Sequence, residues 1–179
     1  ITPVMNEDLS TETTKEELKE AIVDERGVKY SKDGKKLLKA TEGLSGAYSV
    51  KEGTRIICDS AFSWCRSLSE IVIPASVTSI GYRAFSDCQS LSKIVIPSSV
   101  TSIGNWAFND CHSLCKIVIP SSVASIGNSA FSWCESLSKI VIPSSVTSIG
   151  DSVFSWCSSL SEIVIPSSVI SIGDNAFFD

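Results

Sequence analysis

A unit of 23 residues repeats along most of this chain, and this repeat restricts the possible folds more than any other feature of the sequence. The consensus reads Ile-Val-Ile-Pro-Ser-Ser-Val-x-Ser-Ile-Gly-x-x-Ala-Phe-x-x-Cys-x-Ser-Leu-Ser-x, and the copies at 117–139 and 140–162 differ at only five positions. Such a unit cannot bury its apolar side chains by itself, whereas stacked units bury them in one continuous core. The repeat therefore predicts a solenoid, in which chain length sets the number of turns.

Each segment of the unit indicates a local structure. Ile-Val-Ile is β-branched and has the length of a short strand, which the proline ends because it cannot donate to a ladder. In register, these strands predict a short parallel sheet on one face. The glycine suits a sharp turn with positive φ or a close backbone approach, and Ala-Phe-x-x-Cys suits one helical or 3₁₀ turn on the other face.

The repeats extend over residues 48–179 as about six units, of which the first (48–70) is degenerate and the last (163–179) is incomplete. We therefore expect two regions, an N-terminal cap over residues 1–47 and the solenoid over residues 48–179. The register of the first copy is kept by Val50, Thr54, Ile57, Phe62, Cys65 and Leu68.

Residues 1–47 differ in kind from the repeats, because they carry half of the acidic and more than half of the basic residues. Thr14 and Glu17 have the spacing of a capping box, which predicts a helix over about residues 13–26. Residues 28–38 predict a hairpin around an Asp-Gly turn. We expect this helix and hairpin to cover the exposed end of the sheet. A linker or a separate small domain is the alternative.

The apolar residues of each unit also follow the spacing L-x-x-L-x-L, which is a family signature. Examples are Leu91-x-x-Ile94-x-Ile96 and Leu114-x-x-Ile117-x-Ile119. With its 23-residue period, the repeat resembles the BspA-like, or Treponema pallidum-type, class of leucine-rich repeats over about three quarters of the chain. The resemblance implies a right-handed leucine-rich-repeat coil. It also implies a surface or secreted protein of host-associated anaerobic bacteria or parasitic protists. The better-known members are adhesins for host matrix proteins, so it implies a non-catalytic binding or adhesion module.

Positions that stay apolar in every copy are expected to form the core, because a position that accepts Asp or Lys must reach water. Burial of each such side chain is worth on the order of 1.5–3 kcal/mol. The core positions include the phenylalanines Phe62, Phe85, Phe108, Phe131, Phe154 and Phe177, and the columns that begin with Leu68, Ile71, Ile73, Val77 and Ile80.

Five of the seven cysteines occupy one repeated position: Cys65, Cys88, Cys111, Cys134 and Cys157. They form either disulfides or a metal site, or a ladder of inward thiols that act as small core groups. Neighbouring turns are about 4.8 Å apart, which exceeds the roughly 3.8 Å between Cβ atoms that a disulfide prefers, and this favours the ladder. We expect no metal and no cofactor. The two cysteines outside the ladder, Cys58 and Cys115, are expected to be the most accessible thiols.

The residue between the two core isoleucines of each strand is expected to point outward, because side chains alternate along a strand. Valine fills this position, and charged residues precede it. The exposed stripe is a candidate binding face; the alternative is that valine is simply a good strand former and that the charges solvate an edge. The candidate binding residues are Val95, Val118, Val141, Lys93, Lys116 and Lys139.

Two positions near the cysteine, four residues apart, hold tryptophan in some copies and charged residues in others, so these tryptophans should be exposed. If the segment is helical, Trp106, Trp133 and Trp156 share a face and form one patch. Such a patch suits a protein hot spot or the rings of a sugar. Neutral drift or partial burial over the loop below are the alternatives.

Composition excludes several functions. The net charge of -5 gives no electrostatic reason to bind nucleic acid, and the aliphatic runs are far shorter than the roughly 20 residues of a membrane span. His112 is the single histidine and has no nucleophile as partner, so we expect no catalytic residue.

The expected partner is a protein, such as a host matrix protein, or a glycan. The alternative is a structural spacer, or a solenoid that associates with itself at its C-terminal end. The chain starts at Ile1 without an apolar leader, so any export signal has been removed or lies outside this sequence. The resemblance implies that the protein is extracellular or on the cell surface.

Overall fold

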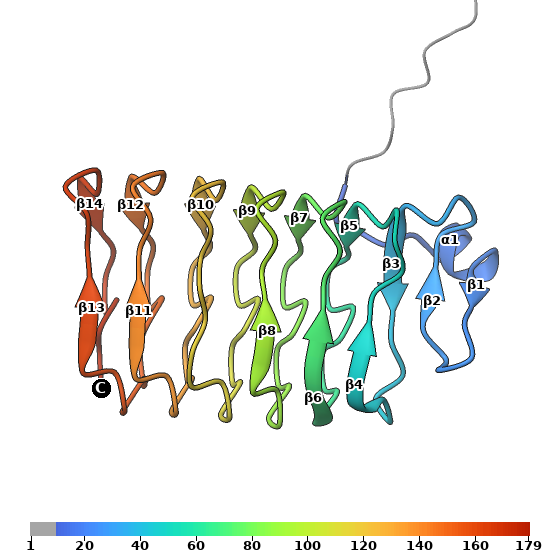
Figure 1. Ribbon diagram of the computed structural model, residues 1–179, viewed down its shortest axis with the longest axis horizontal. Coiled ribbons are helices and arrows are strands. Elements are labelled where there is room, and N and C mark those ends of the chain that lie inside the picture. The colour runs from blue at the N-terminus through green and yellow to red at the C-terminus, as the bar shows by residue number, and fades with distance from the viewer. Residues whose placement is uncertain (1–9) are drawn as a thin grey trace, which may run out of the picture.

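The protein is a rod of stacked turns, with the N-terminal cap at one end and residues 163–179 at the other (Figure 1). The computed structural model describes residues 10–179, so Ile1 and the rest of the first nine residues of the predicted cap lie outside the described part. Each 23-residue unit makes one turn, and equivalent residues of successive turns lie side by side. The predicted solenoid is confirmed.

The Ile-Val-Ile segments form the first parallel sheet, which occupies the lower row of strands in Figure 1. Strands pair in steps of 23 residues, such as Ile71 with Ile94. The ladder is interrupted in the middle, because residues 116–118 form no strand and, within residues 10–179, pair only through one bridge from Lys116 to Lys139. The strands of this first sheet are β4 (Ser45–Ser49), β6 (Ser67–Val72), β8 (Lys93–Val95), β11 (Lys139–Val141) and β13 (Glu162–Val164).

A second parallel sheet, which the sequence did not predict, occupies the upper row in Figure 1. It is built from the Ser-Ile pair before each repeated glycine, and a two-residue strand is too short to be recognised by alternation. Its ladder is interrupted between β10 and β12, after the turn in which the first sheet is interrupted. Its strands in the repeats are β5 (Ile56–Ile57), β7 (Ser79–Ile80), β9 (Ser102–Ile103), β10 (Ser125–Ile126), β12 (Ser148–Ile149) and β14 (Ser171–Ile172).

The prediction of a helical or 3₁₀ turn at Ala-Phe-x-x-Cys is wrong. This segment instead forms a third ladder of hydrogen bonds between successive turns of the solenoid. Every second N–H donates to the next turn, such as Phe85 N to the Ala107 carbonyl at 2.8 Å. The residues two before and two after each phenylalanine have φ between 52 and 68°, and a left-handed residue every fourth position prevents a helix. These residues are Ser60, Trp64, Arg83, Asp87, Trp106, Asp110, Ser129, Trp133, Ser152, Trp156 and Asn175.

A continuous apolar core runs along the axis of the rod. Its phenylalanines stack face to face in one row, with centroids 5.3 Å apart between Phe85 and Phe108 and 5.4 Å apart between Phe108 and Phe131. The central copies of all the predicted core columns are buried, as the comparison of positions predicts. The last turn is the exception, since no further turn covers it in the structure. There Ile165, Ile172 and Phe177 are 38%, 51% and 42% exposed.

The repeated glycines are required by a close backbone approach and not by positive φ, since none of them has a positive φ. A Cβ on Gly127 would lie 2.3 Å from the amide nitrogen of Asn105 and 2.5 Å from its Oδ1 atom. The same Oδ1 accepts a hydrogen bond from Asn128 N at 2.8 Å. An asparagine or aspartate of one turn thus binds the backbone of the next and fills the space that a Cβ would need.

The N-terminal cap contains a shorter helix than the sequence predicts. Helix α1 (Lys15–Lys19) begins with the predicted capping box of Thr14 and Glu17 but ends before the antiparallel pair β1 (Ile22–Val23) and β2 (Lys29–Tyr30). The hairpin prediction is confirmed by β2 and β3 (Lys36–Lys39).

Strand β3 then pairs with β5 in parallel, as β4 does with β6. The parallel stacking therefore starts before residue 48, and β1, β2 and α1 precede it at that end of the rod (Figure 1).

Two properties of residues 10–179 bear on function. Over this range no helix has the length and apolar character needed to cross a bilayer. Over the same range, no three His, Cys, Asp or Glu side chains come together in a way that could hold a metal ion.

Candidate functional site

The outward side of the first sheet presents a stripe of valines, which we call the valine face. Their exposed fractions are 50% for Val72, 70% for Val95, 67% for Val118, 50% for Val141 and 48% for Val164. Alternation along the strands explains this exposure, because the isoleucines on either side point into the core. The structure therefore brings the candidate residues Val95, Val118 and Val141 together on one surface.

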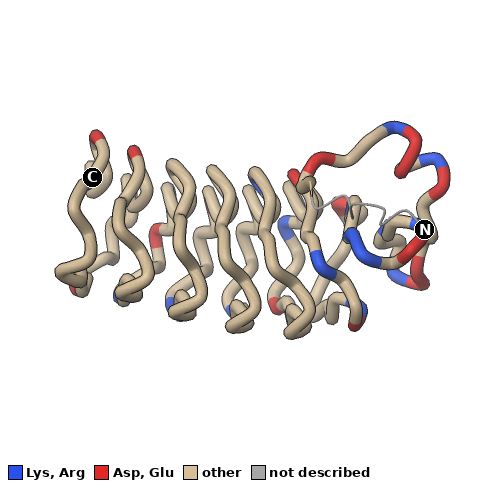
Figure 2. Tube along the Cα trace, turned by 90° about the horizontal axis from the view of Figure 1, so that it is seen from above, with Lys and Arg blue, Asp and Glu red and all other residues tan. Residues whose placement is uncertain are grey.

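A row of charged residues borders the valine face. Lys93 pairs with Glu70 and Lys139 pairs with Glu162, both at 2.8 Å between nitrogen and oxygen. Lys116 stands between the two lysines on this row and, within residues 10–179, has no acidic partner. Figure 2 shows that charged residues gather densely in the N-terminal cap and are spread more thinly along the solenoid. Lys116 is thus an uncompensated cation between two ion-paired lysines.

A hollow of about 390 Å³ opens in the valine face where the ladder is interrupted. It lies between residues 115–119 and residues 138–143 of two neighbouring turns, and Lys116, Lys139, Val118 and Val141 line it. The interruption and the hollow coincide, since a segment that does not pair regularly with its neighbours leaves space between them. This hollow combines apolar walls with two ammonium groups.

The five ladder cysteines are buried free thiols, as the packing argument predicts. Each Sγ donates to a carbonyl oxygen of the preceding turn; Cys111 and Cys134, for example, donate to Phe85 O and Phe108 O at 3.2 Å. Burial raises the pKa of these thiols, to about 11 for Cys65 and about 12 for Cys157. They are therefore packed as protonated core groups.

The two remaining cysteines differ from each other, which corrects the expectation that both are accessible. Cys115 is exposed in the hollow of the valine face. Cys58 is completely buried, packs beside Leu38 and Ile56, and has its pKa raised by burial to about 11. The first turn can hold a cysteine at the glycine position because its side chain enters this small cluster.

Thiol labelling tests this assignment. We expect a maleimide to modify one thiol of the folded protein, Cys115, and all seven after unfolding in urea, because the thiolate is the reactive form and the other thiols are buried. Intact-mass spectrometry counts the labels. Cys115→Ser should leave the folded protein unlabelled, and rapid labelling of any other cysteine would contradict the burial.

The tryptophans do not form the single patch that the sequence predicts. Trp133 and Trp156 stack at 4.9 Å between centroids, and Phe178 meets Trp156 edge-on at 5.3 Å; we call these three residues the tryptophan stack. Trp106 is outside it and lies instead against the guanidinium of Arg83, 5.5 Å from the ring centroid. Phe178 was not among the predicted binding residues, although it is a large aromatic residue at a repeat position otherwise filled by small polar residues.

The residues beside the tryptophan stack are acidic. Asp110 occupies the position of Trp133 one turn earlier and contacts His112. Burial and the neighbouring Asp87 raise the pKa of Asp110, although His112 opposes this shift. His112 is thus partly covered and paired with a carboxylate, rather than a solvated side chain.

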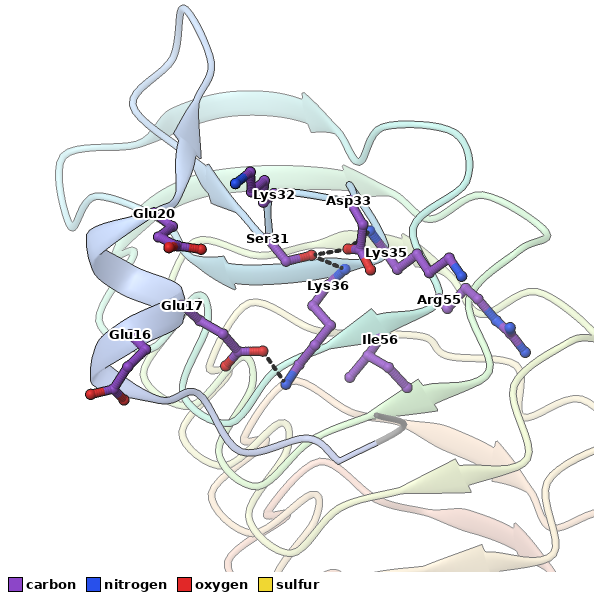
Figure 3. A pocket seen from close by; sticks show the side chains of 10 residues that line it. All are labelled: Glu16, Glu17, Glu20, Ser31, Lys32, Asp33, Lys35, Lys36, Arg55 and Ile56. Carbon is purple, nitrogen blue, oxygen red and sulfur yellow. Dashed lines mark hydrogen bonds and ion pairs between the residues drawn. The ribbon is translucent and has the colours of Figure 1, made fainter. Parts of the chain in front are cut away.

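A second hollow, of about 450 Å³, lies in the cap between α1 and the hairpin (Figure 3). Figure 3 shows Lys36 and Glu17 pointing toward each other, and their ion pair measures 2.8 Å. The Lys36 side chain is only 5% exposed, and it also donates to the Glu12 carbonyl at 2.8 Å. These contacts fix α1 on the sheet, so we interpret this hollow as part of the cap structure.

The Glu17–Lys36 pair should make the cap sensitive to acid. Burial tends to raise the pKa of Glu17, but the hydrogen bond from Lys36 and the capping bonds lower it below the ordinary value of 4.5. A lowered pKa in the folded state means that the pair stabilises the cap fully above pH 4.5 and loses this effect as the pH falls through the lowered value.

Glu17→Gln keeps the capping box, since glutamine also serves at this position, but it removes the charge. We expect a loss of about 1.5–3 kcal/mol at neutral pH, the usual range for a hydrogen bond to a charged group, and a smaller loss in acid. Hydrogen exchange of the α1 amides measures it. A difference that does not change with pH would contradict the role of the carboxylate.

The stacked turns, the two parallel sheets and the inward leucine and isoleucine rows define a leucine-rich-repeat solenoid. The chain belongs to the BspA type leucine rich repeat family, whose pattern matches residues 55–179 in 6 copies. No match was found among the curated proteins.

Solved structures with this fold include three bacterial leucine-rich repeat proteins. The protein from Bacteroides ovatus is 32% identical with a TM-score of 0.76, and the match covers 89% of this chain and 41% of that one. The protein from Eubacterium ventriosum is 24% identical with a TM-score of 0.69, covering 89% and 50%. The T. pallidum leucine rich repeat protein is 27% identical with a TM-score of 0.60, covering 80% and 81%. The chain thus spans half or less of the first two proteins.

Proposed function

We propose that the chain is a non-catalytic binding module of a surface or secreted protein, and that it recognises a protein or glycan partner through the valine face. The observation that carries this proposal is the hollow at residues 115–119 and 138–143, where exposed valines surround the uncompensated Lys116. The family resemblance supports a role in adhesion and a location outside the cell.

The physical argument is that this face combines what an interface needs. Exposed aliphatic side chains gain free energy when a partner covers them, and lysines on a chain of net charge -5 select the orientation of an acidic partner. A solvated edge would need neither the contiguous valines nor the hollow. An acidic protein surface or an anionic glycan meets both requirements.

The experiment is a binding screen of the purified chain against extracellular-matrix proteins and a glycan array. The test variant carries Lys93→Glu, Lys116→Glu and Lys139→Glu, and the control carries Lys15→Glu, Lys19→Glu and Lys32→Glu in the cap, which changes the net charge equally. We expect at least tenfold weaker binding for the test variant alone. Equal loss in both variants, or no binding partner at all, would count against the valine face.

The second candidate function is that of a structural spacer or of a solenoid that associates end to end. The apolar side chains of the last turn favour it, since Ile170 is 87% and Phe178 52% exposed. Light scattering at increasing concentration tests it. A strict monomer would speak against association through this turn.

A further inference from the structure

The four tryptophans of the protein differ in what covers their rings. The guanidinium of Arg66 lies 4.9 Å from the ring centroid of Trp64, and that of Arg83 lies 5.5 Å from the centroid of Trp106. Within residues 10–179, no lysine or arginine covers the ring of Trp133 or Trp156 in this way. The chain therefore pairs the exposed Trp64 and the half-buried Trp106 with its own arginines and leaves the stacked pair without a lysine or arginine.

The repeat register explains this difference. Arg66 stands two residues after Trp64, and the equivalent position after Trp133 is Glu135. Trp64 and Trp133 have the same left-handed backbone conformation, with φ of 68° and 62°. The backbone of Glu135 is therefore placed relative to the Trp133 indole as the backbone of Arg66 is placed relative to the Trp64 indole. The sequence thus puts a carboxylate where the first turn has a guanidinium.

One face of the Trp133 ring is open to a ligand. Trp156, in the next turn, stacks on one face, so the opposite face points toward the preceding turn. There the equivalent position holds Asp110, whose side chain is much shorter than an indole, is 27% exposed and already contacts His112. Trp133 itself is 40% exposed. Trp133 therefore presents a solvent-accessible indole, with the exposed Glu135 two residues along the chain.

We propose that this site binds an arginine or lysine side chain of a protein partner, with the cation over the open face of Trp133 and its N–H groups directed to Glu135. Tryptophan is the best aromatic partner for a cation, and carboxylates are the best acceptors for a guanidinium. This site lies on a different surface from the valine face and does not depend on the proposed function, so it can be tested separately.

The test uses a peptide with two arginines, acetyl-Gly-Arg-Gly-Arg-Gly-amide, and the same peptide with citrulline in place of arginine. Citrulline has nearly the shape of arginine but no charge. We expect the arginine peptide to shift the indole N–H resonances of Trp133 and Trp156 in NMR spectra and to bind at least threefold more tightly than the citrulline peptide. Equal binding of both peptides, or no shift, would overturn the proposal.

Glu135→Arg is the decisive variant, because it gives Trp133 the guanidinium that Arg66 gives Trp64. We expect it to lower the affinity for the arginine peptide at least threefold while the fold stays intact, since residue 135 is exposed. Gln89→Arg is the control, because it changes the same column beside Asp87, where no indole is present. Equal effects of the two variants would overturn the proposal, as would a glycan ligand that depends on Trp133 in the absence of peptide binding.

These results are independent of the valine face. The lysine variants of the proposed function leave this site unchanged, so a partner that depends on Lys116 can fail while the peptide still binds. Conversely, loss of the peptide site leaves the valine-face experiment valid.

Discussion

Phe108→Ala is expected to lower the free energy of unfolding by about 3–5 kcal/mol, the usual cost of removing a buried phenylalanine. Phe108 is fully buried, and its ring lies between those of Phe85 and Phe131 at 5.3 and 5.4 Å. Truncation removes both ring contacts and leaves a cavity between two neighbouring turns. Because each turn contacts only its neighbours, we also expect faster hydrogen exchange mainly in the turns next to residue 108.

Phe177→Ala is the matched control for this change. Phe177 continues the same row, but it is 42% exposed and only Phe154 stacks on it, at 5.7 Å. We expect it to cost about 1–2 kcal/mol, since much less apolar surface leaves contact with the core. Urea unfolding measures both. Equal costs would show that the central row is no better packed than the end.

Gly127→Ala is expected to destabilise the protein by about 3 kcal/mol or more, at the upper end of the usual cost of overpacking. The added methyl would lie 2.3 Å from Asn105 N and 2.5 Å from the carbonyl carbon of Gly104, so the turns would have to separate. Gly43→Ala is the control, because its nearest neighbour is 3.9 Å away and its φ is not positive. We expect the control to change stability by less than about 1 kcal/mol.

Gly150 provides a second test of the same steric argument. There an added methyl would approach within 3 Å only the Oδ1 atom of Asn128, at 2.3 Å, while the nearest backbone atom is 3.5 Å away. We therefore expect Asn128→Ala to relieve part of the cost of Gly150→Ala, whereas Asn105→Ala does not relieve Gly127→Ala. Additive effects in both pairs, measured by a double-mutant cycle, would contradict this account.

The period of the sequence was sufficient to predict the stacking, the first sheet and the buried columns. These features depend on which side chains must avoid water, and comparison of equivalent positions reports this directly. The interruption at residues 116–118 could not be predicted, because this copy has the same Ile-Val-Ile segment as its neighbours. Its irregular pairing arises between turns and not within one unit.

The errors have a common physical origin. Of the two alternatives at the repeated glycines, the close backbone approach is confirmed and positive φ is wrong. The left-handed residues on either side of the repeated phenylalanines are instead tryptophans, aspartates, serines, an arginine and an asparagine. Hydrogen bonds to the next turn hold these residues in a conformation that costs an isolated residue roughly 1–2 kcal/mol. The conformational preference of a single residue does not reflect hydrogen bonds that it makes to the next turn. For the same reason, the prediction that Trp106 shares a helical face with Trp133 is wrong.

At the left-handed positions, the backbone conformation is constant from turn to turn while the side chain varies. One backbone path accepts serine, arginine, aspartate and tryptophan there, because the ladder of backbone hydrogen bonds holds the path whatever the side chain is. Changes at these positions can therefore alter what the rod displays without altering how it stacks. Each turn thus contains two positions at which the backbone conformation stays the same while the side chain varies, from the buried Ser129 to the exposed Trp64.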